Sequence, residues 1–238
     1  MPWMLFSTVL AYFVKGLTGF ANTLIFSTLL SFTSDNVNIS PVELIVGYPA
    51  NVVIAWRERK KIVWRTCLPV AGLVLLGNIP GVFLLKTAGA SQIKLLFGAV
   101  IVGLGAEMLL RERKGGRARG SKALLAAIGL LSGLLCGLYG IGALLAAYMS
   151  RVTDEPASFR GNLCVVFLIE NTFRLILYTC TGILTWPLFT QALCLLPAMA
   201  LGLFLGIRSA QFLPERVVRR VIIVLLILSG LSLIVGQL

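Results

Sequence analysis

Long apolar stretches separated by short polar turns make up most of this chain. A helix of about 20 apolar residues crosses the hydrocarbon core of a bilayer. On this basis six stretches are predicted to be membrane-spanning helices: residues 42–56, 66–85, 95–110, 159–181, 188–207 and 217–236. The pattern therefore predicts an all-α polytopic membrane protein.

Two further apolar runs, residues 2–33 and 123–150, are each interrupted in the middle by glycine. The first contains Gly16-Leu17-Thr18-Gly19 and the second Gly137-Leu138-Tyr139-Gly140. Glycine next to a helix start interrupts the apolar helix at membrane depth. Non-helical backbone at that depth is tolerated only where it is buried in protein or lines a wet cavity. Each run is therefore predicted to be a broken helix.

The chain repeats itself at one constant offset, which relates Gly16 to Gly137, Gly19 to Gly140 and Gly81 to Gly202. Each copy of the broken run is followed by an acidic, proline-containing turn and then by three spans. The sequence thus predicts two homologous halves, residues 1–114 and 123–238, joined by a cytoplasmic linker at residues 115–122. An internal duplication of this kind is typical of transporters built from repeats.

The positions of Lys and Arg distinguish two topologies. If each broken run crosses the membrane once, the halves are parallel and the cations divide almost evenly between the two faces. If each run enters and returns on the same side, the halves are inverted and only Lys86 and Lys94 lie outside. The tendency of cations to stay on the cytoplasmic side favours the inverted repeat. Single crossing remains the alternative.

Composition narrows the class of protein. Of the 238 residues 58% are hydrophobic and 13% charged, and the N-terminus has the features of a structural segment rather than of a signal peptide. The net charge of +12 comes from Lys and Arg in short loops, so we expect a lipid bilayer, and no nucleic acid, as the partner. With no histidine and five scattered cysteines, the chain is predicted to hold no metal and no cofactor. A bacterial-type inner membrane is the expected location.

Lys15 is the first candidate for chemistry, because it is the one formal charge in its apolar run and lies beside the glycine break. A lysine there is costly and by default functional, although it could instead snorkel or pair with a carboxylate. The N–H groups of two helix starts and their dipoles would favour an anion between them. The glycines of the two breaks complete this predicted cradle: Gly16, Gly19, Gly137 and Gly140.

Several polar residues could add hydrogen bonds or charge to the cradle. Thr18, Asn22 and Tyr139 could bind a substrate or simply pack between helices. Asn51 follows Pro49 by two residues and could use a carbonyl freed by the kink or cap it. Arg160 lies near a helix start, where a cation is unfavourable, and is predicted to face a substrate or a phosphate headgroup.

Two pairs with helical spacing, Glu170 with Arg174 and Glu107 with Arg111, are interpreted as intrahelical ion pairs. Glu107 and Glu170 are taken to be the carboxylates clearly within spans, and therefore the candidates to carry a proton.

The chain resembles the sulfite exporter TauE/SafE family of membrane permeases over nearly its whole length. The resemblance rests on Gly16-Leu17-Thr18-Gly19-Phe20, on Gly137-Leu138-Tyr139-Gly140-Ile141-Gly142, on Ser158-Phe159-Arg160, and on Asn51, Arg57, Ile62, Gly77 and Gly81. Two positions depart from the family pattern, which often has glycine where this chain has Ala21 and proline where it has Ala143. The resemblance implies export or exchange of small anions, often sulfur-containing ones such as sulfite and sulfonates.

The sequence therefore predicts a secondary transporter of a small anion, with coupling to a proton or to sodium left open and a homo-oligomer not excluded. A channel or a permease for another small solute is the alternative. A membrane-embedded enzyme lacks a nucleophile with its base. An assembly factor lacks soluble segments, since the longest polar stretch is residues 111–122.

Overall fold

A computed structural model describes residues 2–30, 36–85, 122–139, 142–153 and 155–214, together with single residues or pairs between 99 and 106 and between 217 and 235. Within these ranges every regular element is a helix. The predicted spans 95–110 and 217–236 fall largely outside the described residues, and Glu107 and Arg111 lie outside them altogether.

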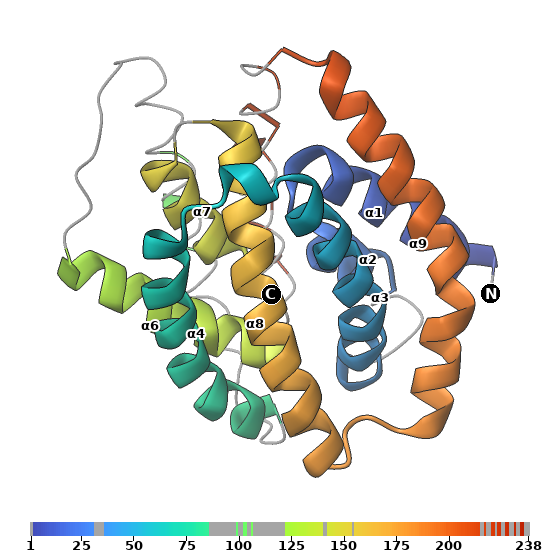
Figure 1. The fold of residues 1–238 in the computed structure, drawn as a ribbon. Helices are drawn as coiled ribbons and strands as arrows, with labels where there is room; N and C mark the ends of the chain where they lie inside the picture. Colours follow the sequence, from blue (N-terminus) through green and yellow to red (C-terminus); the bar gives the residue numbers. More distant parts are fainter. Residues whose placement is uncertain are drawn as a thin grey trace.

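The helices are α1 (Pro2–Thr18), α2 (Asn22–Leu30), α3 (Asn36–Arg57), the short 3-10 helix η1 (Arg59–Lys61), α4 (Trp64–Leu85), α6 (Lys122–Tyr139), α7 (Ala143–Val152), α8 (Pro156–Cys180) and α9 (Trp186–Phe212), as Figure 1 shows. Four segments are long and apolar enough to cross a membrane: Asn38–Arg57, Trp64–Val82, Pro156–Cys180 and Trp186–Phe212. They coincide with four of the predicted spans, which confirms the prediction of an all-helical membrane protein.

Both glycine-containing runs are broken where the sequence predicts. Helix α1 ends at Thr18 and α2 begins at Asn22, while α6 ends at Tyr139 and α7 begins at Ala143. The indole of Trp3 donates a hydrogen bond of 2.9 Å to the carbonyl of Leu29, so the start of α1 lies beside the end of α2. The first broken run is therefore a helical hairpin. A hairpin is the geometry that a segment entering and leaving on one side requires.

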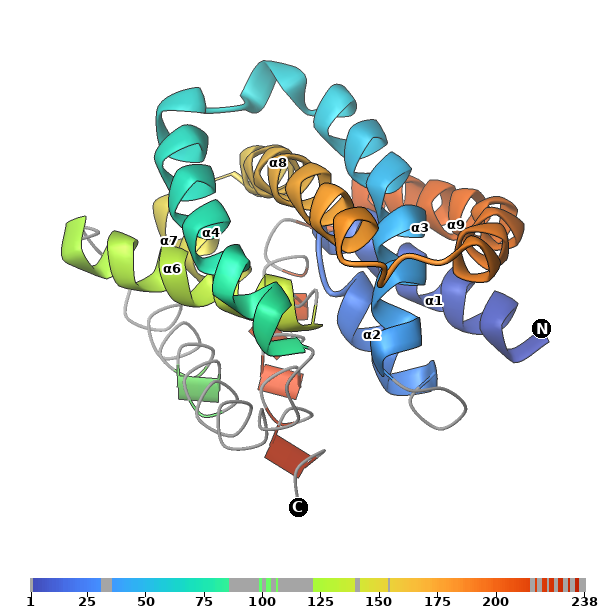
Figure 2. The same ribbon diagram turned by 90° about the horizontal axis from the view of Figure 1, so that it is seen from below.

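The helix contacts follow a two-fold scheme. Helices α3 and α8 pack together in the centre; α9 and then α1 pack outward from α3, and α4 and then α6 pack outward from α8. Helix α2 lies against α3 and α7 against α8 (Figures 1 and 2). Exchanging α1 with α6, α2 with α7, α3 with α8 and α4 with α9 maps the scheme onto itself. The halves are interleaved, because α9 packs on the first half and α4 on the second. Their inverted orientation in a membrane stays a prediction.

Glycines allow the two outer helix pairs to approach closely. A Cβ on Gly206 would lie 2.0 Å from the carbonyl oxygen of Phe13, and one on Gly81 would lie 2.5 Å from that of Leu134. Small residues at such contacts let helix backbones pack directly in a membrane. Phe13 and Leu134 occupy equivalent positions in the two halves, because they are separated by the offset of the repeat. The glycines that contact them, Gly206 and Gly81, are therefore equivalent in structure. The sequence offset instead relates Gly81 to Gly202, which lies one helical turn before Gly206.

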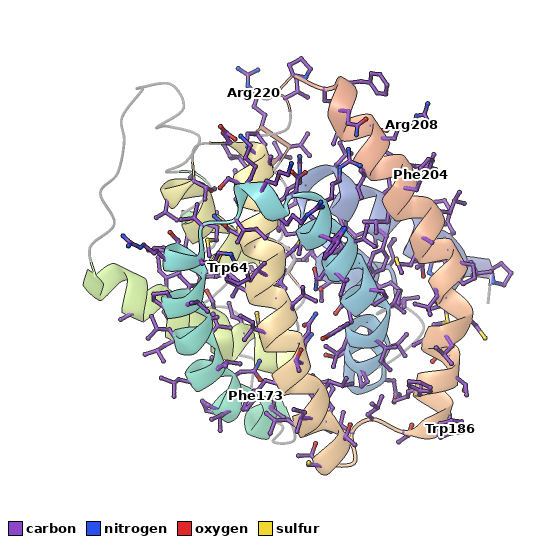
Figure 3. The ribbon with its side chains drawn as sticks, viewed as in Figure 1. Trp64, Phe173, Trp186, Phe204, Arg208 and Arg220 are labelled. Carbon is purple, nitrogen blue, oxygen red and sulfur yellow. The ribbon has the colours of Figure 1, made fainter. Side chains whose placement is uncertain are left out.

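The outer surface is apolar in the manner of a lipid-facing surface. On α9, Phe204 is 59% exposed and Trp186, at the start of the helix, is 74% exposed. Figure 3 shows Trp186 at one end of α9 and Arg208 toward the other. An aromatic residue at one end and a cation at the other are typical of a helix that crosses a bilayer.

Helix α3 begins earlier than predicted. The sequence interpretation made residues 34–41 a turn with Pro41 in the first helical turn, whereas the helix starts at Asn36 and contains Pro41. Glu43 therefore lies about two turns inside the helix rather than at its start. This difference matters for the site, because a carboxylate at a helix start is ordinarily exposed and one two turns inside a span is not.

The far end of α3 is attached to the start of α8. Lys61 lies 2.9 Å from Glu155, and this carboxylate raises the pKa of the Lys61 ammonium. The Val63 backbone N–H donates 2.7 Å to the side chain of Asn162. These contacts hold the basic connection between α3 and α4 against the start of α8.

Candidate binding site

The two helix breaks and the two central helices enclose one interior cavity. It is lined by the start of α2 (Asn22, Thr23, Leu24), the start of α7 (Ala143) and the residues just before each, and by side chains of α3 and α8. Its lining on α3 lies between Glu43 and Asn51 and on α8 between Phe167 and Arg174. These positions are about halfway along both candidate spans. The free volume of about 20 Å³ is room for roughly one water molecule.

Four charged side chains face this cavity although they are almost completely buried. Lys15 is 2% exposed, Glu43 3%, Glu170 2% and Arg174 1%. Ionisable groups at membrane depth are costly and almost always functional or paired. Here the two cations and two carboxylates compensate one another, so the cluster has no net formal charge.

Lys15 is held by the helix that follows the break. Its Nζ donates a 2.9 Å hydrogen bond to Oδ1 of Asn22, the first residue of α2. The amide nitrogen of Asn22 in turn donates to Oε1 of Glu43. The Phe167 ring lies 5.7 Å from Lys15 Nζ, a distance at which a cation is attracted to the ring. The ammonium group is thus positioned at the first tip by neighbours from three helices.

Arg174 connects three helices at the second tip. Its Nη1 donates a 2.6 Å hydrogen bond to the carbonyl of Cys136 on α6. Its Nε lies 3.4 Å from Oε1 of Glu170, and Nη2 lies 3.9 Å from Oε2 of Glu43. Glu170 also accepts a 2.6 Å hydrogen bond from the amide of Asn78 on α4.

Two lining residues, Asn51 and Arg174, each have a buried polar atom without a hydrogen-bond partner among the described residues, Oδ1 and Nε respectively. Asn51 is 1% exposed, and its Oδ1 has no hydrogen-bond partner among the described residues. Buried polar atoms are ordinarily paired. The unpaired amide oxygen beside the cavity therefore indicates an acceptor for a hydrogen bond from a ligand or a water in the cavity.

The first tip is built from backbone that most residues avoid. Gly19 has φ +86° and Ala21, which is not glycine, has φ +68°. Left-handed backbone at both positions turns the chain from α1 into α2 and places the first residues of α2 on the lining of the cavity. The N–H groups of these residues have no partner within their own helix and carry the positive end of its dipole.

The structure brings three of the residues predicted for the cradle together at the cavity: Lys15, Asn22 and Asn51. It places Thr18, Arg160 and three of the glycines elsewhere. Thr18 donates its hydroxyl to backbone carbonyls 2.9 and 3.0 Å away. Arg160 pairs with Glu58 at 3.1 Å rather than facing the cavity.

The glycines predicted to form the cradle make helix contacts instead. Gly16 packs on the backbone of α9, Gly137 packs on that of α4, and Gly19 lies against Arg160. The side chain of Tyr139 and all of Gly140 lie outside the described residues.

Sequence reasoning overlooked Glu43, Phe167 and Arg174 as lining residues. The predicted span begins at residue 42, which places Glu43 at the end of a helix and not within a span. Arg174 was interpreted as half of an intrahelical pair with Glu170, and that pair is present. A signal for Arg174 did exist, since a cation in the middle of an apolar helix is costly even when paired on its own helix. Within the described part of the chain, no group of His, Cys, Asp and Glu could hold a metal ion.

An interior site where interrupted helices meet halfway along two spans is the arrangement of secondary membrane transporters. The comparisons with known proteins agree with this class. The chain belongs to the sulfite exporter TauE/SafE family, whose model matches residues 4–233. This confirms the resemblance seen in the sequence, and the chain is a membrane transporter and not an enzyme.

A curated relative is the "Probable inner membrane transporter protein TsaS" of Comamonas testosteroni, 26% identical over 191 residues, which are 80% of each chain. No solved structure matches this chain.

Proposed function

We propose that this protein is a secondary transporter of a small sulfur-containing anion, sulfite or an organosulfonate, in a bacterial inner membrane. The observation that carries the proposal is the convergence of two helix starts, α2 and α7, with Lys15 and Arg174 on one buried cavity. Helix N-termini and buried cations together form an anion site. The family and the curated relative supply the substrate class and the location.

The anion would bind between the two tips. Lys15 would turn from Asn22 to the anion. Arg174 would offer it the N–H of Nε, which has no hydrogen-bond partner among the described residues, and that of Nη2, which now donates to Asn171 at 3.2 Å. The amide of Asn51 and the free N–H groups of α2 would complete the shell. The cavity would enlarge on loading, because it now has room for about one water and sulfite has four heavy atoms.

Transport would follow from exposing this site to each side in turn. The hairpin tips would move against the central helices α3 and α8, as one repeat rocks against the other. The pair Arg160–Glu58, which lies against Gly19 at the base of the first tip, would close the basic side. A channel is the second candidate, but a cavity with room for about one water, lined by a compensated and almost fully buried charge cluster, favours a carrier.

Counterflow in proteoliposomes tests the proposal. Vesicles loaded with unlabelled sulfite would accumulate labelled sulfite from outside, saturably, if the protein is a carrier. Lys15→Met should lower the uptake at subsaturating sulfite about tenfold or more, because one charge-assisted bond is lost. Lys61→Met is the matched control, since Lys61 is exposed and remote from the cavity. Non-saturating flux would indicate a channel, and equal uptake by wild type and Lys15→Met would refute the site.

A further inference from the structure

The charge of the cavity predicts what must accompany the anion. With Lys15, Arg174, Glu43 and Glu170 all ionised, the cluster has no net formal charge, and each of these residues is at most 3% exposed. A monovalent anion added to this cluster would leave one uncompensated negative charge away from water. Such a charge is strongly unfavourable. One bound proton on a carboxylate removes the excess.

The two carboxylates are not equivalent as sites for this proton. Glu170 is paired with Arg174 of its own helix at 3.4 Å, and it accepts a 2.6 Å hydrogen bond from the Asn78 amide of α4. Glu43 lies between the groups that an anion would recruit. Its Oε1 accepts from the amide of Asn22, which also holds Lys15, and its Oε2 is 3.9 Å from Arg174. An anion that draws away Lys15 and Arg174 therefore weakens the support of Glu43 first.

The surroundings of Glu43 allow it to hold a proton. When Lys15 turns to the anion, Oδ1 of Asn22 loses its donor. Rotation of that amide would let Oδ1 accept a hydrogen bond from a protonated Glu43, and would turn Nδ2 toward the place that Lys15 leaves, where the bound anion can accept from it. The titratable and charged groups that face or influence Glu43 from the helices around it are Tyr12 and Lys15 on α1, Cys136 on α6, and Glu170, Arg174 and Tyr178 on α8.

We propose that Glu43 is the binding site of a coupling proton, and that one proton and one monovalent anion bind together and cross in the same direction. This inference rests on the proposed function. Binding of the anion favours protonation of Glu43, and by linkage protonation favours the anion equally. Loss of a proton from Lys15 would have the opposite effect, because a bound anion stabilises the charged lysine.

The test uses methanesulfonate, whose charge does not change between pH 5 and 9, so that any proton movement belongs to the protein. Sulfite is run in parallel. Proteoliposomes containing a pH dye in the lumen receive an inward anion gradient, with the membrane potential set by potassium and valinomycin. Counterflow of each labelled anion is measured on the same preparations, because exchange needs no net proton movement.

In the wild type, entry of methanesulfonate should acidify the lumen, and its rate should not respond to the membrane potential. In Glu43→Gln, which imitates the protonated side chain, acidification should fall about tenfold or more relative to the counterflow of the same preparation, since the linkage has been removed. The remaining net uptake of this variant should become sensitive to potential. Glu155→Gln, at an exposed carboxylate outside the cavity, is the matched control and should behave as the wild type.

Three results would overturn the inference. The first is wild-type anion entry without acidification, which needs no variant to fold. The second is unchanged acidification in Glu43→Gln, and the third is loss of acidification in Glu170→Gln but not in Glu43→Gln. Absence of counterflow for both anions in the wild type would refute the proposed function itself, and this inference with it.

Discussion

Ala21 provides a test of the geometry of the first helix break. It is not glycine, yet it has φ +68° and lies 8% exposed at the turn that directs α2 at the cavity. Left-handed backbone costs a residue with a Cβ roughly 1–2 kcal/mol. Replacing Ala21 with glycine should remove that strain.

A matched control isolates the strain. Ala143 is 3% exposed, lines the same cavity and begins α7 with helical backbone. Ala→Gly at either site loses one buried methyl and gains the same unfolded-state entropy, so these contributions cancel between the two variants. Ala143→Gly should destabilise the protein by about 1 kcal/mol. Ala21→Gly should be more stable than Ala143→Gly by about 1–2 kcal/mol, which is the strain.

The free energy of unfolding in mixed detergent and SDS, measured for both variants and the wild type, checks this expectation. Counterflow of sulfite confirms that each variant is folded before it is compared. The reasoning is refuted if Ala21→Gly is destabilised as much as Ala143→Gly, because Ala21 would then not occupy the left-handed region.

Two further predictions concern packing and charge. Gly16→Ala should destabilise the protein by about 1–3 kcal/mol, because its Cβ would lie 2.7 Å from backbone atoms of α9. Gly72→Ala is the control and should not destabilise the protein, because a Cβ at Gly72 meets nothing within 4 Å. Unfolding free energies compare the two, and equal losses would contradict the close approach of α1 and α9. Arg174→Met should cost about 3–5 kcal/mol by leaving buried carboxylates uncompensated, and adding Glu170→Gln should recover part of it. Unfolding free energies of the single and double variants measure this, and a double variant no more stable than Arg174→Met would show that the two charges are not coupled.

The architecture was largely predictable, because it follows from hydropathy and from helix breakers. The four described spans follow from apolar length and the breaks near Gly19 and Gly140 follow from the glycines, and both features depend only on local sequence. The use of each glycine was not predictable. Gly16 and Gly137 were expected at the anion, whereas they bring α1 against α9 and α6 against α4. The same residue type serves both purposes, and the partner helix is distant in the sequence.

The charged site was only partly predictable for a related reason. Lys15 was expected because nothing in its own run could compensate it. Arg174 has Glu170 one turn away, so sequence alone accounts for its charge, and its contacts with Cys136 and Glu43 arise only when α3, α6 and α8 pack together. Glu43 was missed because the start of α3 was predicted six residues too late.

The most direct test of the central claim is to locate a bound anion. Selenite is a close analogue of sulfite, and selenium gives an anomalous signal in crystals of the protein. The account predicts a selenium peak in the cavity, with selenite oxygens within hydrogen-bond distance of Lys15 Nζ and of the Arg174 guanidinium, and no such peak in Lys15→Met. A second pocket is lined by Arg57, Glu58 and Arg160. A selenium peak confined to that pocket would contradict the account, because the anion would then bind near the end of α3 and the start of α8.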